Sequence, residues 1–348
     1  MKKILFEDLE DLSLGVTVLG SGGGGNPSYD LLIAKQHMKD HGEAHLLDVT
    51  DLNDNDFVAP LAFIGAPLVG MEKLPSGREF CVLLETLEKV TGKKVTHLMP
   101  AEIGGGNALT PFMVASQLRI PILDADTIGR AFPELQMSSC NLHGISPSPA
   151  FLSDSLGNVV IVNGNDGYTI ERFCRNITVE MGSSAALSLY MMSGKEAKKA
   201  VIAGSVSKAI SIGKTMRIAK KKGTSPLSVL LDYTGGLLLA SGMIVDIEQS
   251  VQEGFLKGSF SLHTDKGDLE VFYQNEYLAV FHEKRALALT PDIIIPLEEE
   301  SGKPITSESL IYGLRVVLIK LPAPDLWKTK QGMKFVGPQY FGYNMKGR

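Results

Sequence analysis

The order of apolar and amphipathic segments in the first 130 residues restricts the fold more than any other feature of the chain. Short apolar segments predict strands, and the longer segments between them have the periodicity of helices. Because parallel strands need crossover connections, this order predicts an α/β domain whose sheet is largely parallel or mixed. Strands are expected at 16–19, 44–49, 61–64, 96–99 and 121–123. Helices are expected at 26–41, 78–90 and 111–118.

The second half of the chain has a different pattern. A hairpin is expected over 151–162, and helices are expected over 166–192 and 197–222, the latter interrupted near Gly213. From residue 254 onward, short alternating segments predict antiparallel strands, which together with the helices indicate a β-rich α+β domain. The strands are expected at 255–263, 269–272, 277–281, 292–296 and 314–321.

The length of the chain favours two domains. Single hydrophobic cores stop growing near ~250–300 residues, and this chain has 348. The strand–helix pattern ends near residues 164–168. We therefore expect an α/β domain over 1–165, followed by a helical segment and a β-rich domain over 166–348.

Charge and cysteine content exclude several classes of protein. A formal net charge of −5 argues against a nucleic-acid-binding protein, which usually has a basic excess. Cys81, Cys140 and Cys174 form no Cys-x-x-Cys pair for zinc, and they fit a reducing compartment, so a cytoplasmic protein is expected. No segment reaches the ~18 apolar residues of a membrane span. A homo-oligomer is expected because most soluble oligomers are assemblies of identical chains.

Four of the predicted strands end in glycine-rich or acidic segments, and these segments form the candidate site. The carboxyl ends of parallel strands lie along one edge of a sheet, where open α/β sheets bind ligands. The candidate catalytic residues are Asp124, Asp126, Glu72, Glu134 and His143. The candidate substrate-binding residues are Gly22, Gly23, Gly24, Gly25, Asn26, Lys73, Glu102, Gly105, Gly106, Asn107 and Arg130.

The first glycine-rich segment, LGSGGGGNP over 19–27, contains the spacing Gly-x-Gly-x-x-Gly of dinucleotide-binding loops. Asp48 at the end of the next predicted strand would then be the ribose acceptor. However, four consecutive glycines match that spacing almost automatically, and the Asn26–Pro27 helix start comes after the third glycine. No dinucleotide is therefore expected. A loop whose backbone N–H groups bind a small ligand or an oxyanion, and a purely structural turn, both stay open.

Asp124 and Asp126 are two residues apart, so in an extended segment both face the same side. Neighbouring carboxylates can divide acid and base roles because repulsion and burial separate their pKa values. With Glu102 or Glu72, the two aspartates could also hold a divalent metal ion. The structural alternative is that one aspartate caps the helix expected near Arg130.

Other candidates also have structural alternatives. Glu72 and Lys73 could form a surface pair, and His143 could be an ordinary loop histidine. Glu134 follows Pro133 in the first turn of a predicted helix, where the helix dipole alone favours an acid. The segment QNE at 274–276 could reach the site from the second domain, or it could simply be a hairpin turn.

An ordered set of motifs over roughly residues 14–343 resembles the DUF917 family, described as S-methyl-thiohydantoin desulfurase-like. The resemblance implies a two-domain protein, α/β and then β-rich. It implies hydrolysis that removes sulfur from a thiohydantoin-type ring, and a link to hydantoinase/oxoprolinase-type enzymes. The motifs are LGSGGGGNP, GAPLVGMEK, AEIGGGNAL, LDADTIGRAFPELQM, VFYQNEYLAV, TPDIII and IYGLRVVLIKLPAPDLW.

The implied reaction needs activated water, a proton donor for the leaving sulfur and donors that stabilise charge on the ring. In this hypothesis Asp124 or Asp126 activates water, directly or through a metal, and His143 or Glu134 moves a proton. The two glycine-rich loops hold the ring carbonyl through their N–H groups. Arg130 or Lys73 supports negative charge, and Asn26 and Asn107 recognise the ring amide.

Three functions remain open from the sequence. The first is a hydrolase of a small cyclic amide or thioamide, of the thiohydantoin or hydantoin type. The second is a non-catalytic accessory subunit that binds such a ring for a hydantoinase-like partner. The third is a dinucleotide-dependent oxidoreductase. The acidic residues at the strand ends favour an enzyme over a binding subunit, since a binder needs donors but no paired acids.

Overall fold

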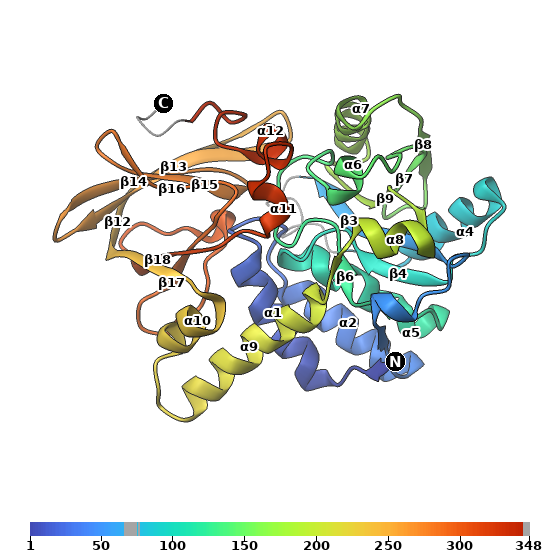
Figure 1. Ribbon diagram of the computed structural model, residues 1–348, viewed down its shortest axis with the longest axis horizontal. Coiled ribbons are helices and arrows are strands. Elements are labelled where there is room, and N and C mark those ends of the chain that lie inside the picture. Colours follow the sequence, from blue (N-terminus) through green and yellow to red (C-terminus); the bar gives the residue numbers. More distant parts are fainter. Residues whose placement is uncertain (66–74, 76, 344–348) are drawn as a thin grey trace.

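Most strands of the first half of the protein, by which we mean residues 1–221, form one mixed sheet. This confirms the predicted α/β class. The computed structural model describes residues 1–65, 75 and 77–343. Its first sheet contains β1 (Lys2–Lys3), β2 (His45–Leu47), β3 (Phe57–Gly65), β4 (His97–Pro100), β5 (Ile122–Leu123), β7 (Ala150–Ser153), β8 (Val159–Val162), β9 (Ser184–Ser188) and β10 (Met192–Ser193). The order is β1-β2-β5-β4-β3-β9-β7-β8, with β10 paired to β3. Figure 1 labels β4, β3, β9, β7 and β8 of this sheet. Strands β2, β5, β4 and β3 run parallel, and the other pairs run antiparallel.

Helices cover both faces of this sheet, and β3 is therefore buried on both sides. Ala59 and Leu61 belong to one hydrophobic cluster, whereas Val58 and Ile64 belong to another. The α-helices of this half are α1 (Phe6–Leu19), α2 (Ser28–His41), α4 (Glu79–Thr91), α5 (Ala115–Leu118), α6 (Ser139–Leu142), α7 (Gly167–Glu180), α8 (Gly194–Ala200) and α9 (Ser205–Lys221). Two 3₁₀ helices, η1 (Val49–Asp51) and η2 (Gly105–Met113), and a small two-stranded sheet of β6 (Ala125–Asp126) and β11 (Ile202–Ala203) complete it.

Helices α1 and α9 pack closely because each presents a glycine to the other. A Cβ atom on Gly15 would lie 1.9 Å from the Ala209 carbonyl oxygen, and one on Gly213 would lie 1.8 Å from that of Asp11. The buried Asp11 carboxylate also accepts hydrogen bonds from both Arg217 Nε and Nη2, at 2.6 and 2.9 Å. The glycine at 213 therefore allows a helix crossing, and α9 continues through it without interruption.

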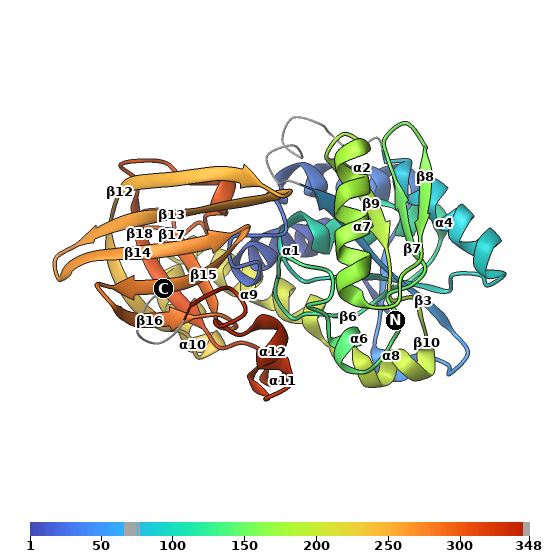
Figure 2. The ribbon, with the colours of Figure 1, turned by 90° about the horizontal axis from the view of Figure 1, so that it is seen from above.

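The second half forms an antiparallel sheet of seven strands, which confirms the predicted β-rich domain. Its strands are β12 (Leu237–Gln252), β13 (Phe255–Thr264), β14 (Gly267–Gln274), β15 (Glu276–His282), β16 (Arg285–Leu289), β17 (Ile293–Glu298) and β18 (Arg315–Leu321). The order is β16-β15-β14-β13-β12-β18-β17. The short helices of this half are α10 (Pro226–Thr234), η3 (Ser307–Ser309), α11 (Asp325–Lys328) and α12 (Gly332–Val336). Figure 2 shows this sheet beside the mixed sheet, with α9 and α1 near the junction.

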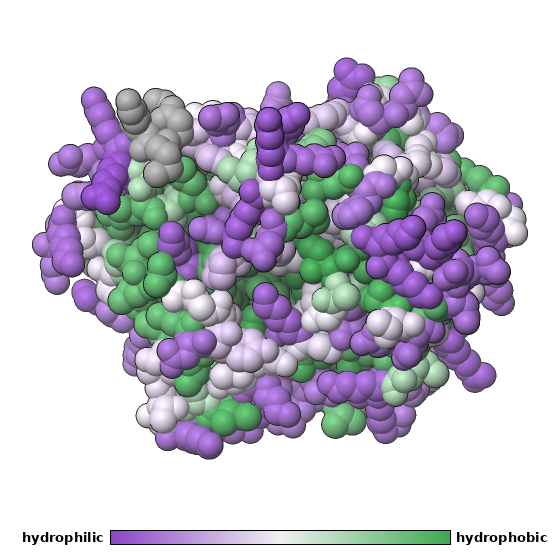
Figure 3. All heavy atoms as spheres, in the orientation of Figure 1, coloured by the Kyte–Doolittle hydropathy of each residue, from purple (hydrophilic) through white to green (hydrophobic). Residues whose placement is uncertain are grey.

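The two halves share one hydrophobic core. The largest cluster joins Leu12 of α1 and Ile210 of α9 to Ile244 of β12 and Leu318 of β18. In Figure 3 apolar side chains gather over the β-rich half and near the middle of the face shown, with hydrophilic side chains around the periphery. Within the described residues, no helix combines the length and apolar character needed to cross a bilayer.

Some predicted elements differ from the structure. Residues 16–19 form the last turn of α1 and not a strand, because Val16 continues the buried face of Leu9 and Leu12. Periodicity alone does not separate a short buried strand from the end of a buried helix. The helix expected over 166–192 ends at Glu180, and β9 and β10 follow it and complete the first sheet. The next helical region breaks at residues 201–204, where β11 pairs with β6.

Candidate functional site

The two glycine-rich segments bind each other through their backbones. Gly106 N donates to Gly25 O at 2.9 Å, and Asn107 N donates to Gly24 O at 3.2 Å. A Cβ atom on Gly24 would lie 2.2 Å from Gly104 O, and one on Gly105 would lie 2.3 Å from Gly25 O. The glycines are therefore required for close contact between the loops, since any side chain would separate them.

The start of the first glycine loop is inserted into the C-terminal sheet. Tyr277 N of β15 donates to Ser21 O at 2.6 Å, and Ile294 N of β17 donates to Ser21 Oγ at 3.0 Å. Ser307 N donates to Gly22 O at 3.0 Å. This loop follows a helix, whereas the dinucleotide fingerprint requires a preceding strand. Its first residues are used to hold the two halves of the protein together.

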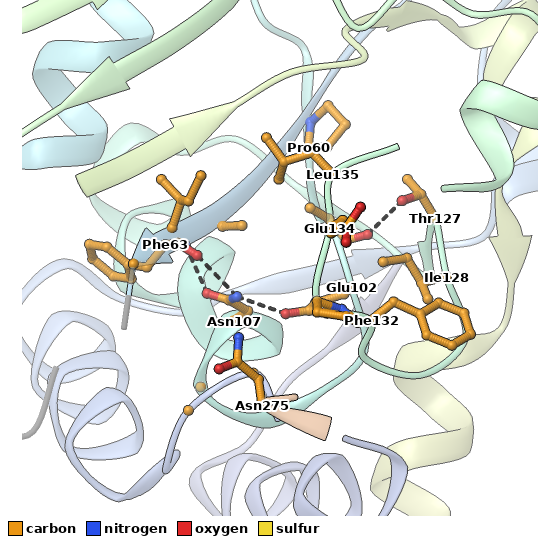
Figure 4. Close-up of a pocket in the computed structure, with 18 of the residues that line it drawn as sticks. Pro60, Phe63, Glu102, Asn107, Thr127, Ile128, Phe132, Glu134, Leu135 and Asn275 are labelled. Carbon is orange, nitrogen blue, oxygen red and sulfur yellow. Dashed lines mark hydrogen bonds between the residues drawn. The ribbon is translucent and has the colours of Figure 1, made fainter. Parts of the chain in front are cut away.

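A cavity of about 170 Å³ lies where both glycine loops meet the ends of β3 and β4 and the turn between β14 and β15. A single water needs about 10–15 Å³ on this scale, so the cavity has room for a small ring. Of the predicted binding residues, Gly24, Gly25, Asn26, Glu102, Gly106 and Asn107 line it, whereas Gly22, Gly23, Gly105 and Arg130 do not. Among the described residues its lining acids are Asp30, Glu102, Glu134 and Glu276, and its apolar wall includes Pro60, Phe63, Ile128, Phe132 and Leu135 (Figure 4).

Glu102 lies at the carboxyl end of β4, and its carboxyl group is held at one oxygen. Asn107 Nδ2 donates to Glu102 Oε1 at 2.8 Å, whereas Oε2 is buried and has no hydrogen-bond partner among the described residues. Burial raises the pKa of Glu102 to about 8. The group is therefore largely protonated at neutral pH, and it offers a buried proton to a ligand in the cavity.

Asn107 orients Glu102 and does not have a free amide for a substrate. Its Oδ1 accepts from Phe63 N at 2.7 Å, and its Nδ2 donates to Phe63 O at 3.2 Å as well as to Glu102. Figure 4 shows this amide between Phe63 and Glu102. The recognition of a ring amide by Asn107, expected from the sequence, is replaced by a positioning role.

The second domain contributes Glu276, the first residue of β15. Its side chain is 2% exposed, and burial raises its pKa well above the usual value, with the charge of Glu102 adding to the effect. A Cβ atom on Gly23 would lie 1.9 Å from Glu276 Oε1, so this glycine makes room for the carboxyl group. The neighbouring Asn275 forms the turn with a φ of 57°, so this segment is both a hairpin turn and part of the site.

Arg130 is fully buried behind the cavity and supports these acids without lining it. Its Nε donates to Ala131 O at 2.9 Å, and its Nη1 donates to the carbonyls of Pro291 and Asp292 at 2.6 and 2.8 Å. Burial lowers its pKa to about 10, while the charges of Glu276, Asp292 and Glu102 oppose that shift. Arg130 does not line the cavity in this geometry, so its expected contact with substrate stays a prediction.

Asp30, in the first turn of α2, is a lining acid that we did not identify from the sequence. Its Oδ2 lies 2.0 Å from where a Cβ atom on Gly106 would be, so it contacts the second glycine loop. Burial raises its pKa to about 7. The helix start that positions it was predicted one residue too early: Pro27 and not Asn26 is the N-cap, and α2 begins at Ser28, although Asn26 Oδ1 accepts from Ser28 N at 3.0 Å.

Asp124 and Asp126 do not lie together in the site, which corrects the expectation of a paired carboxylate centre. Asp124 Oδ1 accepts from Ser207 N at 2.9 Å and caps α9. Asp126 is fully buried, and its Oδ2 accepts from the N–H groups of Ile103, Ile128 and Gly129 at 2.9, 2.9 and 2.6 Å. Burial raises the pKa of Asp126 to about 6, and neither aspartate lines the cavity.

The other candidates are placed as follows. His143 ends α6, is exposed, and pairs through Nδ1 with Ser139 O at 2.8 Å, away from the cavity lining. Glu72 and Lys73 lie outside the described residues. Over residues 1–65, 75 and 77–343, no three His, Cys, Asp or Glu side chains are grouped to hold a metal ion, so the expected set of Asp124, Asp126 and Glu102 does not form one.

Fold and site together define a class: a two-domain α/β protein with a buried acidic cavity at the junction of its sheets. Residues 7–164 match the S-Me-THD-like N-terminal domain, and residues 165–348 match the S-Me-THD-like C-terminal domain. The chain therefore belongs to the S-Me-THD-like family.

A crystal structure of a protein from Chromobacterium violaceum has a similar fold. It is 23% identical in sequence, with a TM-score of 0.79, and the alignment covers 96% of this chain and 95% of that one. No curated protein matches this sequence.

Proposed function

We propose that this protein is a hydrolase of small cyclic amides or thioamides, acting on a thiohydantoin- or hydantoin-type ring, and that it releases thiol or sulfide from the rings that carry sulfur. Membership of the S-Me-THD-like family supports a hydantoin-related function. The observation that carries the proposal is Glu102, a buried carboxyl group fixed by Asn107 at one oxygen, with the other oxygen unpartnered among the described residues. Such a group is suited to protonate a poor leaving group.

The proposed reaction adds water to the ring carbon that carries sulfur. A carbon–oxygen bond forms and the carbon–sulfur bond breaks. For an S-methyl ring, one proton of water passes through Asp30 to the ring nitrogen, and the other returns to Glu102 as the carbonyl forms, replacing the proton that Glu102 gives to the leaving thiol. For a thioamide ring both protons of water end on the released sulfide. Asp30 accepts the first proton from water, because its pKa of about 7 leaves a usable fraction ionised at neutral pH. Glu102 gives its proton to the sulfur as the bond breaks.

These two roles predict a bell-shaped pH dependence. The rate rises as the pH increases through about 7, where Asp30 loses its proton and becomes a base. It falls as the pH increases through about 8, where Glu102 loses the proton that it must donate. The maximum is expected between these values, and substitution of Glu102 by glutamine removes the proton donor.

The test is thiol or sulfide release from a panel of thiohydantoins and S-methyl-thiohydantoins across pH 5–10. We expect Glu102→Gln to lower kcat by about 100-fold or more, within the usual range for loss of a general acid. Glu85→Gln, on the exposed face of α4, is the matched control and should leave turnover unchanged. Full activity in the Glu102→Gln protein would refute the assignment of Glu102 as the proton donor. Release from no ring by the unmodified protein would overturn the proposed reaction and favour a binding subunit for a hydantoinase-like partner.

A further inference from the structure

One end of the cavity contains acceptors that the proposed reaction does not use. Figure 4 shows Glu134 beside Leu135, on the other side of the cavity from Asn107 and Asn275. Tyr340 Oη donates to Glu134 Oε2 at 2.6 Å, and Gln136 Nε2 donates to the same oxygen. These two donors fix the carboxylate through this one oxygen.

A second observation in the same cavity is the hydroxyl of Tyr190. The side chain lines the cavity and is 2% exposed, and its oxygen has no hydrogen-bond partner in the part of the chain that the structure describes. Tyr190 also has a φ of 54°, which is uncommon for a bulky residue. Strain of this kind is typical of residues held in place for binding.

The charges at this end match a cation. Arg175 also lines the cavity, but its Nε donates to Glu171 Oε1 at 2.5 Å, so its charge is already balanced. Tyr168 lies near Glu134, whose charge adds to burial in raising the pKa of this tyrosine. A fixed carboxylate among tyrosines is an arrangement that binds ammonium or guanidinium groups, through charge-assisted hydrogen bonds and contact with aromatic rings.

We propose that Glu134 and Tyr190 form a subsite for a cationic substituent, so that the preferred ring carries an ammonium or guanidinium side chain. This inference rests on the proposed function for the identity of the ring. It makes Glu134 a specificity-determining residue, whereas the sequence suggested a proton carrier. The reacting end of the ring then lies toward Glu102 and Asp30, and its basic side chain extends toward Glu134.

The experiment compares three 5-substituted S-methyl-thiohydantoins with side chains of equal length: aminobutyl, pentyl and carboxypropyl. We expect kcat/KM for the aminobutyl ring to exceed that for the pentyl ring by about 10- to 100-fold, the range of a charge-assisted hydrogen bond. In Glu134→Gln this ratio should fall toward 1. Tyr340→Phe should lower it less, and the exposed control Glu180→Gln should leave it unchanged.

Calorimetric binding measures the subsite separately from the reaction. Its ligands are the corresponding rings with oxygen in place of sulfur, which cannot release a thiol. Turnover without preference for the basic ring would overturn the subsite and leave the proposed function intact. Absence of turnover, with Glu134-dependent binding of the basic ring, would support the subsite and overturn the reaction. Neither turnover nor selective binding would overturn both. If Glu134→Gln does not fold, the Tyr340→Phe ratio decides the question.

Discussion

Replacing Glu102 by glutamine should make the protein less sensitive to high pH as well as inactive. The wild-type carboxyl group is buried beside Asn107, and burial raises its pKa from 4.5 to about 8. A carboxyl group whose pKa is raised by folding binds more protons in the folded state. Its contribution to stability is therefore complete below pH 4.5 and is lost as the pH rises to about 8.

The magnitude follows from this shift. Each unit of pKa difference corresponds to about 1.4 kcal/mol, so Glu102 should lower the free energy of unfolding by roughly 3 kcal/mol between pH 5 and pH 8. Glutamine has a similar shape and does not ionise, so this loss is absent in the variant. The charge of Glu102 also raises the pKa of Glu276, so its removal should reduce the pH dependence further.

Urea unfolding of both proteins at several pH values between 5 and 9 measures this effect. We expect the difference in free energy of unfolding, variant minus wild type, to increase by about 3 kcal/mol over pH 5–8. Glu85→Gln should follow the wild-type curve, because this side chain is exposed. Parallel curves for the wild-type protein and Glu102→Gln would refute the reasoning, since they would mean that Glu102 is already ionised in the folded protein.

Two other substitutions test the assignments of the loops and of Asp124. Asp124→Ala removes the side chain that caps α9 and should lower the free energy of unfolding in urea by about 1 kcal/mol. Turnover should remain, because Asp124 does not line the cavity. Loss of turnover in a folded variant would return Asp124 to the site. Gly23→Ala places a Cβ atom 1.9 Å from Glu276 Oε1 and should lower the melting temperature, and adding Glu276→Ala should restore part of it. No recovery in the double variant would show that the clash lies elsewhere.

The fold was predictable where the local pattern matched the final packing. Strands β13, β14 and β15 alternate buried and exposed residues or are continuously apolar, and they were found. Strand β12 was missed, because most of its residues are exposed or half-buried and it has no clear alternation. The hairpin of β7 and β8 was found, whereas β9 was hidden in an apolar run that also fits a helix.

The site was predictable as a region but not as a set of roles. The acidic and glycine-rich segment after β4 lies at the cavity, with Glu102, Gly106 and Asn107 in its lining. Part of the first glycine loop also lines it, although that loop follows a helix and not the expected strand. An aspartate is equally suitable as a base or a helix cap, and what decides for Asp124 is the pairing of β6 with β11, which brings the start of α9 beside it. Asp30 was missed because nothing in a first helical turn shows that its side chain will be buried.

The insertion of Ser21 and Gly22 into the C-terminal sheet also has a consequence for the order of folding. These residues bind partners that are 256 and 285 positions later in the chain. During synthesis the loop leaves the ribosome first, yet its partners are made almost at the end, and contacts of such long sequence separation form slowly. The nascent chain must therefore keep this loop unpaired until translation is nearly complete, and the cavity is among the last parts of the protein to form.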